Sequence, residues 1–148
     1  MTTDNEVGRE ADDPINPSHY TSHPSGIECI EISKHLSGCL AQAFQYVWRC
    51  GQKDDPVQEL KKAIWFIEAE LSVQQDDRLI VRKVMLIDEK LKALSNHDFG
   101  SKFEALSLIA NANKSGNPRY TMLVKTMHVI NAMISEYNTN NGRTTTNN

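Results

Sequence analysis

Apolar residues recur at intervals of three and four positions along most of the chain, and this spacing limits its fold more than any other feature. Strict alternation of apolar and polar residues, which would predict half-buried strands, is scarce. Capping and stop signals divide the apolar pattern into about six segments. The sequence therefore predicts an all-α fold of about six helices, in which an N-terminal three-helix unit precedes further C-terminal helices.

The first helix is predicted from a capping signal. Ser25 precedes Glu28 by three residues, as in a capping box, so the helix is expected to begin at Gly26 and Ile27. Gly38 stands where a glycine commonly ends a helix. The proline-containing segment that precedes this helix is expected to form a turn.

Two further helices complete the N-terminal unit. The second is predicted over residues 39–50, with Gly51 in the stop position. Asp55 and Pro56 are the residue types that favour the N-cap and the first position of the third helix, which runs to Leu71. Each helix carries an apolar stripe at helical spacing, so the three are expected to share a core.

Further helices are predicted in the second half of the chain. Residues 72–78, SVQQDDR, form either an exposed extension of the third helix or a short hinge. The apolar spacing across residues 80–94 predicts a long amphipathic helix. Ser101 and Glu104 predict a capping box for the next helix, and the Asn-Pro pair at 117–118 is expected to open the last one.

Composition divides the chain into four parts. Residues 1–13 are acidic and polar, and residues 138–148 are of low complexity, so both ends are expected to be disordered. Between them lie the three-helix unit, residues 14–71, and a C-terminal helical region, residues 72–137. No internal repeat is evident.

Charge and hydropathy argue against two classes of protein. The net charge of −3 and the pI near 5.9 argue against a surface built to coat nucleic acid. No apolar run approaches the roughly 18 to 20 residues that span a bilayer. The chain is therefore expected in the cytoplasm, with no membrane partner and no strong nucleic-acid footprint.

The sequence predicts no metal site and contains no common catalytic motif. Its three cysteines include no CxxC pair and are expected to be buried and free. His19 and His23 are four positions apart, without a Cys or a carboxylate at metal-binding spacing. The patterns GxxxxGK[ST], GxGxxG, HExxH and GxSxG are all missing. A phosphate site in this chain must therefore be built in another way.

Polar residues gather where the predicted helices meet their loops. Tyr46 and Arg49 lie three positions apart on one helix face, and Lys53 follows just beyond Gly51. Arginine offers phosphate oxygens a planar fork of donors, and lysine offers a mobile positive charge, so this group suits a phosphorylated ligand. In the alternative interpretation, Arg49 and Lys53 complement a helix dipole and Lys62 belongs to a solvated face.

Four short motifs follow one another in the first half of the chain. They are Pro17-Ser18-His19-Tyr20, Ile27-Glu28, Tyr46-Val47-Trp48-Arg49-Cys50-Gly51-Gln52-Lys53 and Glu59-Leu60-Lys61-Lys62-Ala63. At these residues the chain resembles a phage nucleotide kinase family that lacks a phosphate-binding loop and was formerly known only as a domain of unknown function. The resemblance covers residues 14–71. In place of the basic residue that precedes the tyrosine in the family pattern stands Gln45, and in place of the usual upstream Gly-Asn pair stands Ala41-Gln42.

This resemblance implies a function. A coliphage member of the family is a deoxynucleoside monophosphate kinase, so the resemblance implies a transferase that moves a phosphoryl group to a (deoxy)nucleoside monophosphate. It further implies ATP and Mg²⁺ as cofactors, nucleotides as partners, a homo-oligomer and a place in the host cytoplasm.

The family positions also suggest roles for individual residues. Arg49 and Lys53 are expected to hold phosphates and to stabilise the charge on the transferred group. His19, or alternatively Glu59 through Mg²⁺, is expected to orient the acceptor. The nucleotide-binding residues are expected to be Asn16, Tyr20, Tyr46, Trp48, Glu59 and Lys62. Trp48 and Trp65 suit either stacking on a base or anchoring a core. Replacing Arg49 with Ala is expected to abolish turnover and to leave the fold intact.

Three other functions compete with this one. A non-catalytic protein would use the same site to bind or sequester nucleotides, and would act on host nucleotide pools or defence signals. An all-α nucleotide pyrophosphohydrolase needs an ExxE motif followed by ExxD, and only the first is present, at Glu28 and Glu31. A purely interacting protein would use its C-terminal helices to form an oligomer or to bind a host factor.

Overall fold

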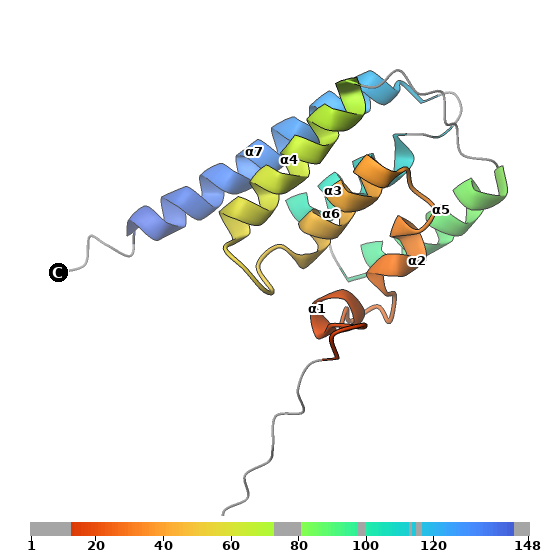
Figure 1. Ribbon diagram of the computed structural model, residues 1–148, viewed down its shortest axis with the longest axis horizontal. Helices are drawn as coiled ribbons and strands as arrows, with labels where there is room; N and C mark the ends of the chain where they lie inside the picture. The colour runs from red at the N-terminus through yellow and green to blue at the C-terminus, as the bar shows by residue number, and fades with distance from the viewer. Residues whose placement is uncertain (1–12, 73–80, 98–99, 113, 115–116, 144–148) are drawn as a thin grey trace, which may run out of the picture.

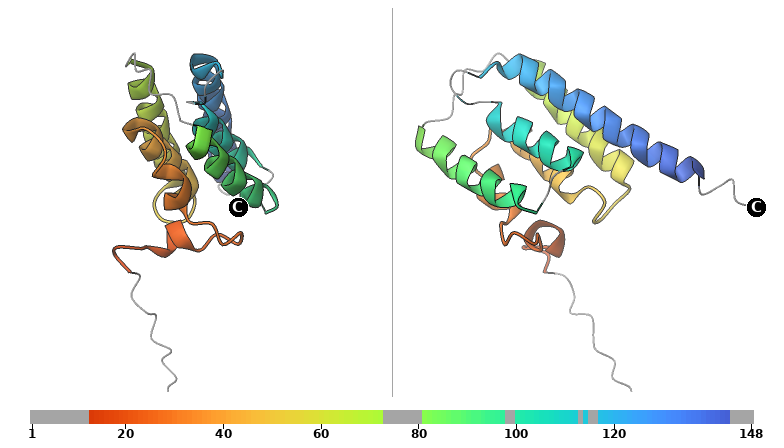
Figure 2. Two further views of the ribbon diagram at one scale, coloured as in Figure 1. Left: turned by 90° about the vertical axis from the view of Figure 1, so that its right-hand side faces the viewer. Right: turned by 180° about the vertical axis from the view of Figure 1, so that it is seen from behind.

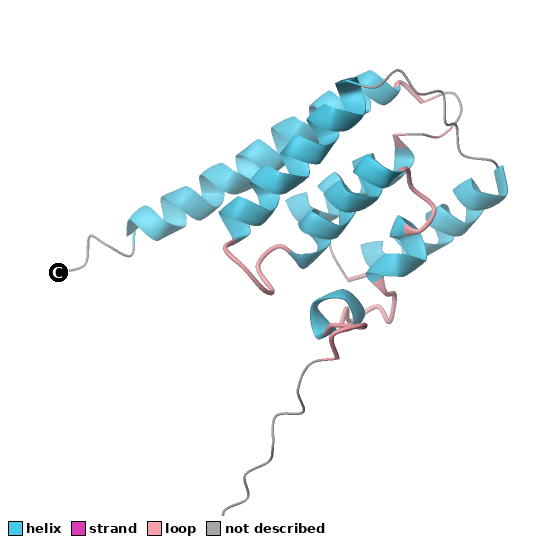
Figure 3. Ribbon diagram, viewed as in Figure 1, coloured by secondary structure: helices cyan, strands magenta, loops and turns pink. Residues whose placement is uncertain are grey.

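The computed structural model describes residues 13–72, 81–97, 100–112, 114 and 117–143. Within these ranges the chain forms seven α-helices and no β-strand (Figure 1, Figure 3), which confirms the predicted all-α class. The helices are α1 (Ser18–Thr21), α2 (Cys29–Ser33), α3 (Gly38–Arg49), α4 (Pro56–Ser72), α5 (Val81–Ser95), α6 (Ser101–Asn111) and α7 (Arg119–Arg143).

Four of these helices form a bundle. Helix α3 contacts α4, α4 contacts α7, α7 contacts α6, and α6 contacts α3 in turn. The left view of Figure 2 shows two layers, with α3 and α4 in one and α5, α6 and α7 in the other. The predicted units at residues 14–71 and 72–137 therefore supply the two sides of one core.

The apolar stripes seen in the sequence fill the bundle. Leu40, Phe44 and Val47 of α3, one or two turns apart, are completely buried, as are the matching residues of the other bundle helices. Those matching residues are Leu60, Ala63, Ile67, Ala105, Ile109, Leu123 and Ile130. Each large side chain buried in this way contributes about 1.5–3 kcal/mol, so the core is the main source of stability.

Helices α1, α2 and α5 lie outside the bundle. Helix α5 packs on α6 and α2, while α1 and α2 pack on α3. An ion pair between Lys90 Nζ of α5 and Glu31 Oε1 of α2, 2.7 Å long, joins the two layers at the surface.

The start that the sequence predicts for the first helix, at Gly26 and Ile27, is wrong. Helix α2 begins at Cys29, and its capping box is formed by Glu28 and Glu31. Ser25 Oγ instead accepts the N–H of Ile27, in a turn that Gly26 allows with its φ of 77°. The serine therefore stabilises the turn before the helix. A further short helix, α1, occupies the segment that was expected to form a turn.

Of the other predicted boundary signals, two are confirmed and two are wrong. Asp55 Oδ1 accepts the N–H of Val57 at 3.0 Å, which confirms the predicted start of α4. Gly51 ends α3 with a φ of 83°, as expected of a stop residue. Gly38 begins α3 and does not end the preceding helix, and Ser101 is the first residue of α6, whose N-cap is Gly100 without a side-chain cap.

The last helix is longer than predicted. Helix α7 continues to Arg143, so disorder from residue 138 onward is wrong for residues 138–143. Thr139 Oγ1 donates to the carbonyl of Ser135 at 2.9 Å, and extending an existing helix adds one backbone hydrogen bond per residue. The predictions for residues 1–12, 73–80 and 144–148 lie outside the described part of the chain. None of the described helices combines the length and the apolar character that crossing a bilayer requires.

Candidate functional site

A buried ion pair joins the end of α3 to the start of α4. Arg49 Nε donates to Glu59 Oε2, and Arg49 Nη2 donates to Glu59 Oε1 at 3.0 Å. The Glu59 side chain is fully buried and that of Arg49 is 15% exposed. Arg49 stands in the last turn of α3 and Glu59 in the first turn of α4, so each charge also complements its own helix dipole. The pairing holds the guanidinium in one orientation.

Helix α1 brings Tyr20 to the same arginine. Arg49 Nη1 donates to the Tyr20 hydroxyl at 3.1 Å. The hydrogen bond with Glu59 is the main reason, and that with Tyr20 a further one, that the pKa of Arg49 lies above its ordinary value. Arg49 is therefore a permanent cation, with three of its five N–H donors used by these two residues.

Aromatic rings surround this pair on the outer side of α4. The guanidinium of Arg49 lies 4.6 Å from the centroid of the Tyr46 ring, and Lys62 Nζ lies 5.4 Å from it. Tyr46 stacks on Phe66, with ring centroids 5.8 Å apart. Phe66 in turn meets the edge of Trp65, whose side chain is exposed. The Tyr46 ring thus contacts two cations and one aromatic ring.

The charges of the cluster balance one another. Lys62 Nζ is 3.8 Å from Glu59 Oε1, and Asp54 Oδ2 is 3.8 Å from Arg49 Nη2. Two cations, Arg49 and Lys62, thus face two carboxylates. Lys53 lies in the exposed turn that follows α3, and its side chain makes no ion pair with a described residue of this cluster. Lys53 and the half-exposed Lys62 are therefore the cations most open to an incoming anion.

The C-terminal helices hold the turn that carries Lys53. Lys102 Nζ of α6 donates to the carbonyl of Cys50 at 3.2 Å, where α3 ends. The hydroxyl of Tyr137 on α7 lies against Gly51, where an added Cβ would approach it to 3.3 Å. The second half of the chain thus positions part of the candidate site.

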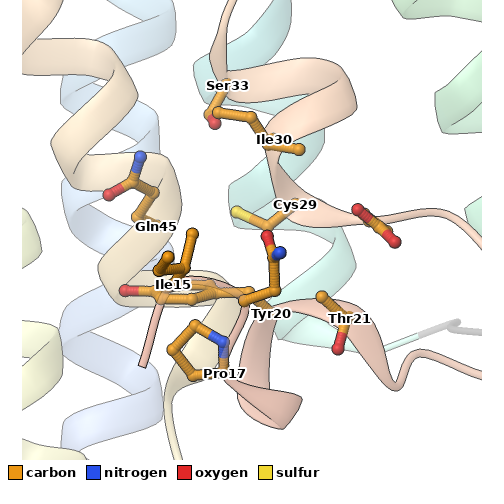
Figure 4. A pocket seen from close by; sticks show the side chains of 10 residues that line it. Ile15, Pro17, Tyr20, Thr21, Cys29, Ile30, Ser33 and Gln45 are labelled. Carbon is orange, nitrogen blue, oxygen red and sulfur yellow. The ribbon is translucent and has the colours of Figure 1, made fainter. Parts of the chain in front are cut away.

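A pocket lies beside the ion pair, between α1, α2 and the middle of α3. Its volume is about 170 Å³, and its lining residues are Ile15, Asn16, Pro17, Tyr20, Thr21, Glu28, Cys29, Ile30, Ser33 and Gln45. Figure 4 shows the Tyr20 ring edge-on below the pocket, with Gln45, Cys29 and Ser33 above it. Tyr20 therefore belongs to both features, since its ring lines the pocket and its hydroxyl bonds to Arg49.

The structure thus brings most of the predicted residues together. Tyr20, Tyr46, Arg49, Glu59 and Lys62 form the cluster, and Asn16 lines the adjoining pocket. Sequence analysis missed the pairing of Arg49 with Glu59, because it joins two helices, and missed the pocket residues Gln45 and Ser33. Gln45 carries a usable signal, since it precedes Arg49 by four positions and so shares a helix face with it.

Three predicted roles require correction. Trp48 is 3% exposed and packs against Phe44, so it anchors the core and has no open face for a base. His19 is buried and packs against the Tyr20 ring, with centroids 4.3 Å apart, so its side chain is not open to an acceptor nucleotide. Glu59 holds Arg49 with both carboxylate oxygens, which removes it as a ligand for Mg²⁺.

Comparison with known proteins finds one match. Residues 15–68 match the family described as a protein of unknown function (DUF3310). No curated protein and no solved structure matches the chain. The Arg49 cluster and the residues that line the adjoining pocket fall within the matched segment, whereas α5, α6 and α7 lie outside it.

Proposed function

We propose that this chain is a phage nucleotide kinase that acts in the host cytoplasm and transfers a phosphoryl group from ATP to (deoxy)nucleoside monophosphates. The observation that carries the proposal is the continuity of the charged and aromatic cluster around Arg49 with a ring-sized pocket, through the shared residue Tyr20. A nucleotide has the same two parts, a charged phosphate group and a planar base.

The surface cations are assigned to the phosphates. Lys53 is exposed and the Lys62 side chain is 48% exposed, while Glu59 and Tyr20 fix the direction of the Arg49 guanidinium. Phosphoryl transfer depends mainly on positioning and on electrostatic stabilisation of the transferred group, which such residues supply.

Mg²⁺ is assigned to the nucleotide. The described residues include no group of three or more His, Cys, Asp or Glu side chains placed to hold a metal. Mg²⁺ commonly binds through substrate phosphates with one or two carboxylates, so it would neutralise charge on ATP. Among the described residues of the cluster, Asp54 alone has an exposed carboxylate, so it is the side chain that could share Mg²⁺ with the nucleotide.

Product analysis tests this proposal. The full chain is incubated with ATP, Mg²⁺ and each deoxynucleoside monophosphate, and products are resolved by anion-exchange chromatography. We expect a diphosphate from at least one substrate, with turnover reduced at least tenfold in Lys62→Ala. Lys61→Ala, an exposed neighbour on the same helix, is the matched control and should retain turnover. Absence of any diphosphate from the wild-type chain contradicts the kinase assignment.

A second function is favoured by one observation. Glu59 already neutralises Arg49, and the arginine is only 15% exposed, which suits a protein that holds a nucleotide without transferring its phosphate. Such a sequestering protein would retain a nucleotide tightly in equilibrium dialysis and form no product with ATP.

We also propose that the chain forms a homo-oligomer. The exposed apolar side chains available to such an interface are Trp65 of α4, Met85 of α5 and Tyr120 of α7, which are 62%, 67% and 70% exposed. Light scattering coupled to size exclusion measures the mass directly, and a monomer at the concentrations used for catalysis contradicts this assignment.

A further inference from the structure

We propose that the pocket between α1, α2 and α3 holds the base of the nucleotide, and that the Gln45 amide and the Ser33 hydroxyl bond to the polar edge of that base. The inference rests on the proposed function, because it divides one nucleotide between two parts of the same site. It gives Gln45 and Ser33 a role in binding that the sequence analysis had not assigned to them.

The size of the pocket suits one planar ring system. Its volume is about 170 Å³, and an apolar cavity of about 150 Å³ is known to hold a single benzene ring. A base fits this space, whereas the sugar and phosphates must remain outside. Apolar side chains make up much of the wall, among them Ile15, Pro17 and Ile30, and a few polar groups interrupt it, as in other small-molecule pockets.

The charge of the pocket also favours a base over a phosphate. No lysine, arginine or histidine is among the described residues that line it. Cys29 presents an uncharged thiol, because burial raises its pKa to about 12. The Glu28 carboxylate caps α2 by accepting the backbone N–H of Glu31. A phosphate would find no cation here, while a neutral ring meets no charge that opposes it.

Ser33 supplies an independent sign that a ligand is expected. Ser33 is 2% exposed, and among the described residues its Oγ has only the Cys29 thiol as a hydrogen-bond partner. The neighbouring Cys29 thiol is only a weak hydrogen-bonding group. An unsatisfied buried hydroxyl is unfavourable, and a ligand atom that pairs with it offsets that penalty. The polar side chains face the same space above Tyr20 (Figure 4).

Helix geometry connects the pocket to the cations. Gln45 precedes Arg49 by four residues on α3, which is one helical turn or a rise of about 6 Å. Tyr20 connects the pocket to Arg49, since its ring lines the pocket and its hydroxyl accepts a hydrogen bond from Arg49. A base beside Gln45 therefore directs its sugar and phosphates toward Arg49 and Lys62.

Titration calorimetry on the full chain tests this division. The probes are four nucleosides, their 5′-monophosphates and inorganic phosphate. Gln45→Leu removes the amide from the pocket, and Gln42→Leu is the matched control, exposed on the same helix and outside the pocket. We expect Gln45→Leu to weaken a nucleoside and its monophosphate by the same factor, about tenfold or more, because one buried hydrogen bond is lost. Gln42→Leu should change neither affinity.

Ser33→Ala gives a second, independent measurement. It removes the unsatisfied hydroxyl without adding bulk, so it should lower base affinity and leave the melting temperature unchanged or higher. A lower melting temperature with unchanged affinity would show that the hydroxyl serves only the fold.

The outcomes separate this inference from the proposed function. If the wild-type chain and both glutamine variants bind a monophosphate equally, the base lies elsewhere and the kinase proposal stands. If nucleoside binding depends on Gln45 but ATP yields no diphosphate, the pocket assignment is supported and phosphoryl transfer is contradicted. If no nucleoside and no monophosphate binds, both are overturned.

Discussion

The two ends of α4 carry the same pair of residues in different surroundings. Glu59 near its start and Glu70 near its end are both buried, and each forms an ion pair with an arginine, Arg49 or Arg119. Eleven residues separate the two glutamates, close to three helical turns, so both face the same side of the helix. By composition alone, either end is an equal candidate for a site.

Their neighbours distinguish them. At the end of α4, Arg119 Nη2 donates to Glu70 Oε1 at 2.7 Å and to the Glu70 carbonyl at 3.1 Å, and Ser37 Oγ donates to the same carboxylate. Those groups link α4 to α7 and to the N-cap of α3. At the start of α4 the pair adjoins an aromatic face, an exposed lysine and a pocket. A buried ion pair is therefore weak evidence for a site, and its accessible neighbours are the stronger evidence.

The largest predicted effect is common to both ends. Arg49→Ala and Arg119→Ala each leave a buried carboxylate without its cation, which should lower the free energy of unfolding by about 3–5 kcal/mol. This replaces the sequence-based expectation that Arg49→Ala keeps its fold. Urea denaturation followed by circular dichroism measures both losses, and a change below 1 kcal/mol at either end contradicts the buried pairing.

Double variants then separate the ends by function. Arg49→Met with Glu59→Leu, and Arg119→Met with Glu70→Leu, replace each pair by apolar side chains and should restore most of the lost stability. Only the first double variant should lose nucleotide binding in equilibrium dialysis. Loss of binding in the second would show that the Glu70 end takes part in the site.

The next effect comes from Gly38, which begins α3, and Gly51, which follows its end. Gly51 has a φ of 83° and lies against the Tyr137 hydroxyl, so Gly51→Ala should lower stability by about 1–2 kcal/mol. At the opposite end of α3, a Cβ at Gly38 would meet no atom within 4 Å. Gly38→Ala should therefore stabilise the chain, by about 0.4–1 kcal/mol. Opposite shifts in thermal melting are expected, and equal shifts would contradict the geometry of the turn.

A smaller effect comes from the hydroxyl group that bonds to the ion pair at each end of α4, from Tyr20 at its start and from Ser37 at its end. Tyr20→Phe and Ser37→Ala each remove one hydroxyl that bonds to a charged pair, and each should lower stability by about 1 kcal/mol. Tyr20→Phe keeps the ring that lines the pocket and should slow turnover more than it weakens nucleoside binding. Ser37→Ala should leave both properties unchanged, and a catalytic defect in it would argue against the contrast between the ends.

The smallest effect belongs to a partly exposed ion pair, that of Lys90 with Glu31. The hydrogen bond from Lys90 is the main reason that the pKa of Glu31 lies below its ordinary value of 4.5. The pKa of Glu31 is lower in the folded chain than in the unfolded chain. The ion pair therefore contributes its full stability above the unfolded-state pKa, and this stability is lost as pH falls through the folded-state pKa. Melting temperatures between pH 6 and about pH 3 should fall slightly more steeply in the wild-type chain than in Glu31→Gln. Parallel curves would mean that the pair adds nothing.

The sequence predicts those features that depend on neighbouring residues. Asp55 at the start of α4 and Gly51 at the end of α3 act within a few residues of themselves, and both were predicted correctly. Ser25 failed as a cap because its hydroxyl had another local partner in the preceding turn. A single sequence offers no means of choosing between two such nearby partners.

Features that join distant segments were not predicted. The motifs identified Arg49 and Glu59 separately, but only packing of α4 on α3 shows that they satisfy each other. Trp48 and Trp65 looked equivalent in sequence, and their positions around the helices decide that one is buried and the other exposed. The pocket depends on three elements, so no single stretch of sequence contains it.

The exposed ring of Trp65 gives the unlabelled chain its own optical reporter. Trp65 touches Phe66, which stacks on Tyr46, the ring that both cluster cations approach. Acrylamide in solution should therefore quench Trp65 fluorescence readily, while Trp48 emits from the core and is shielded from the quencher. Nucleotide that settles over Tyr46 would change the accessible fraction of the emission, so occupancy of the site can be followed in real time with light alone.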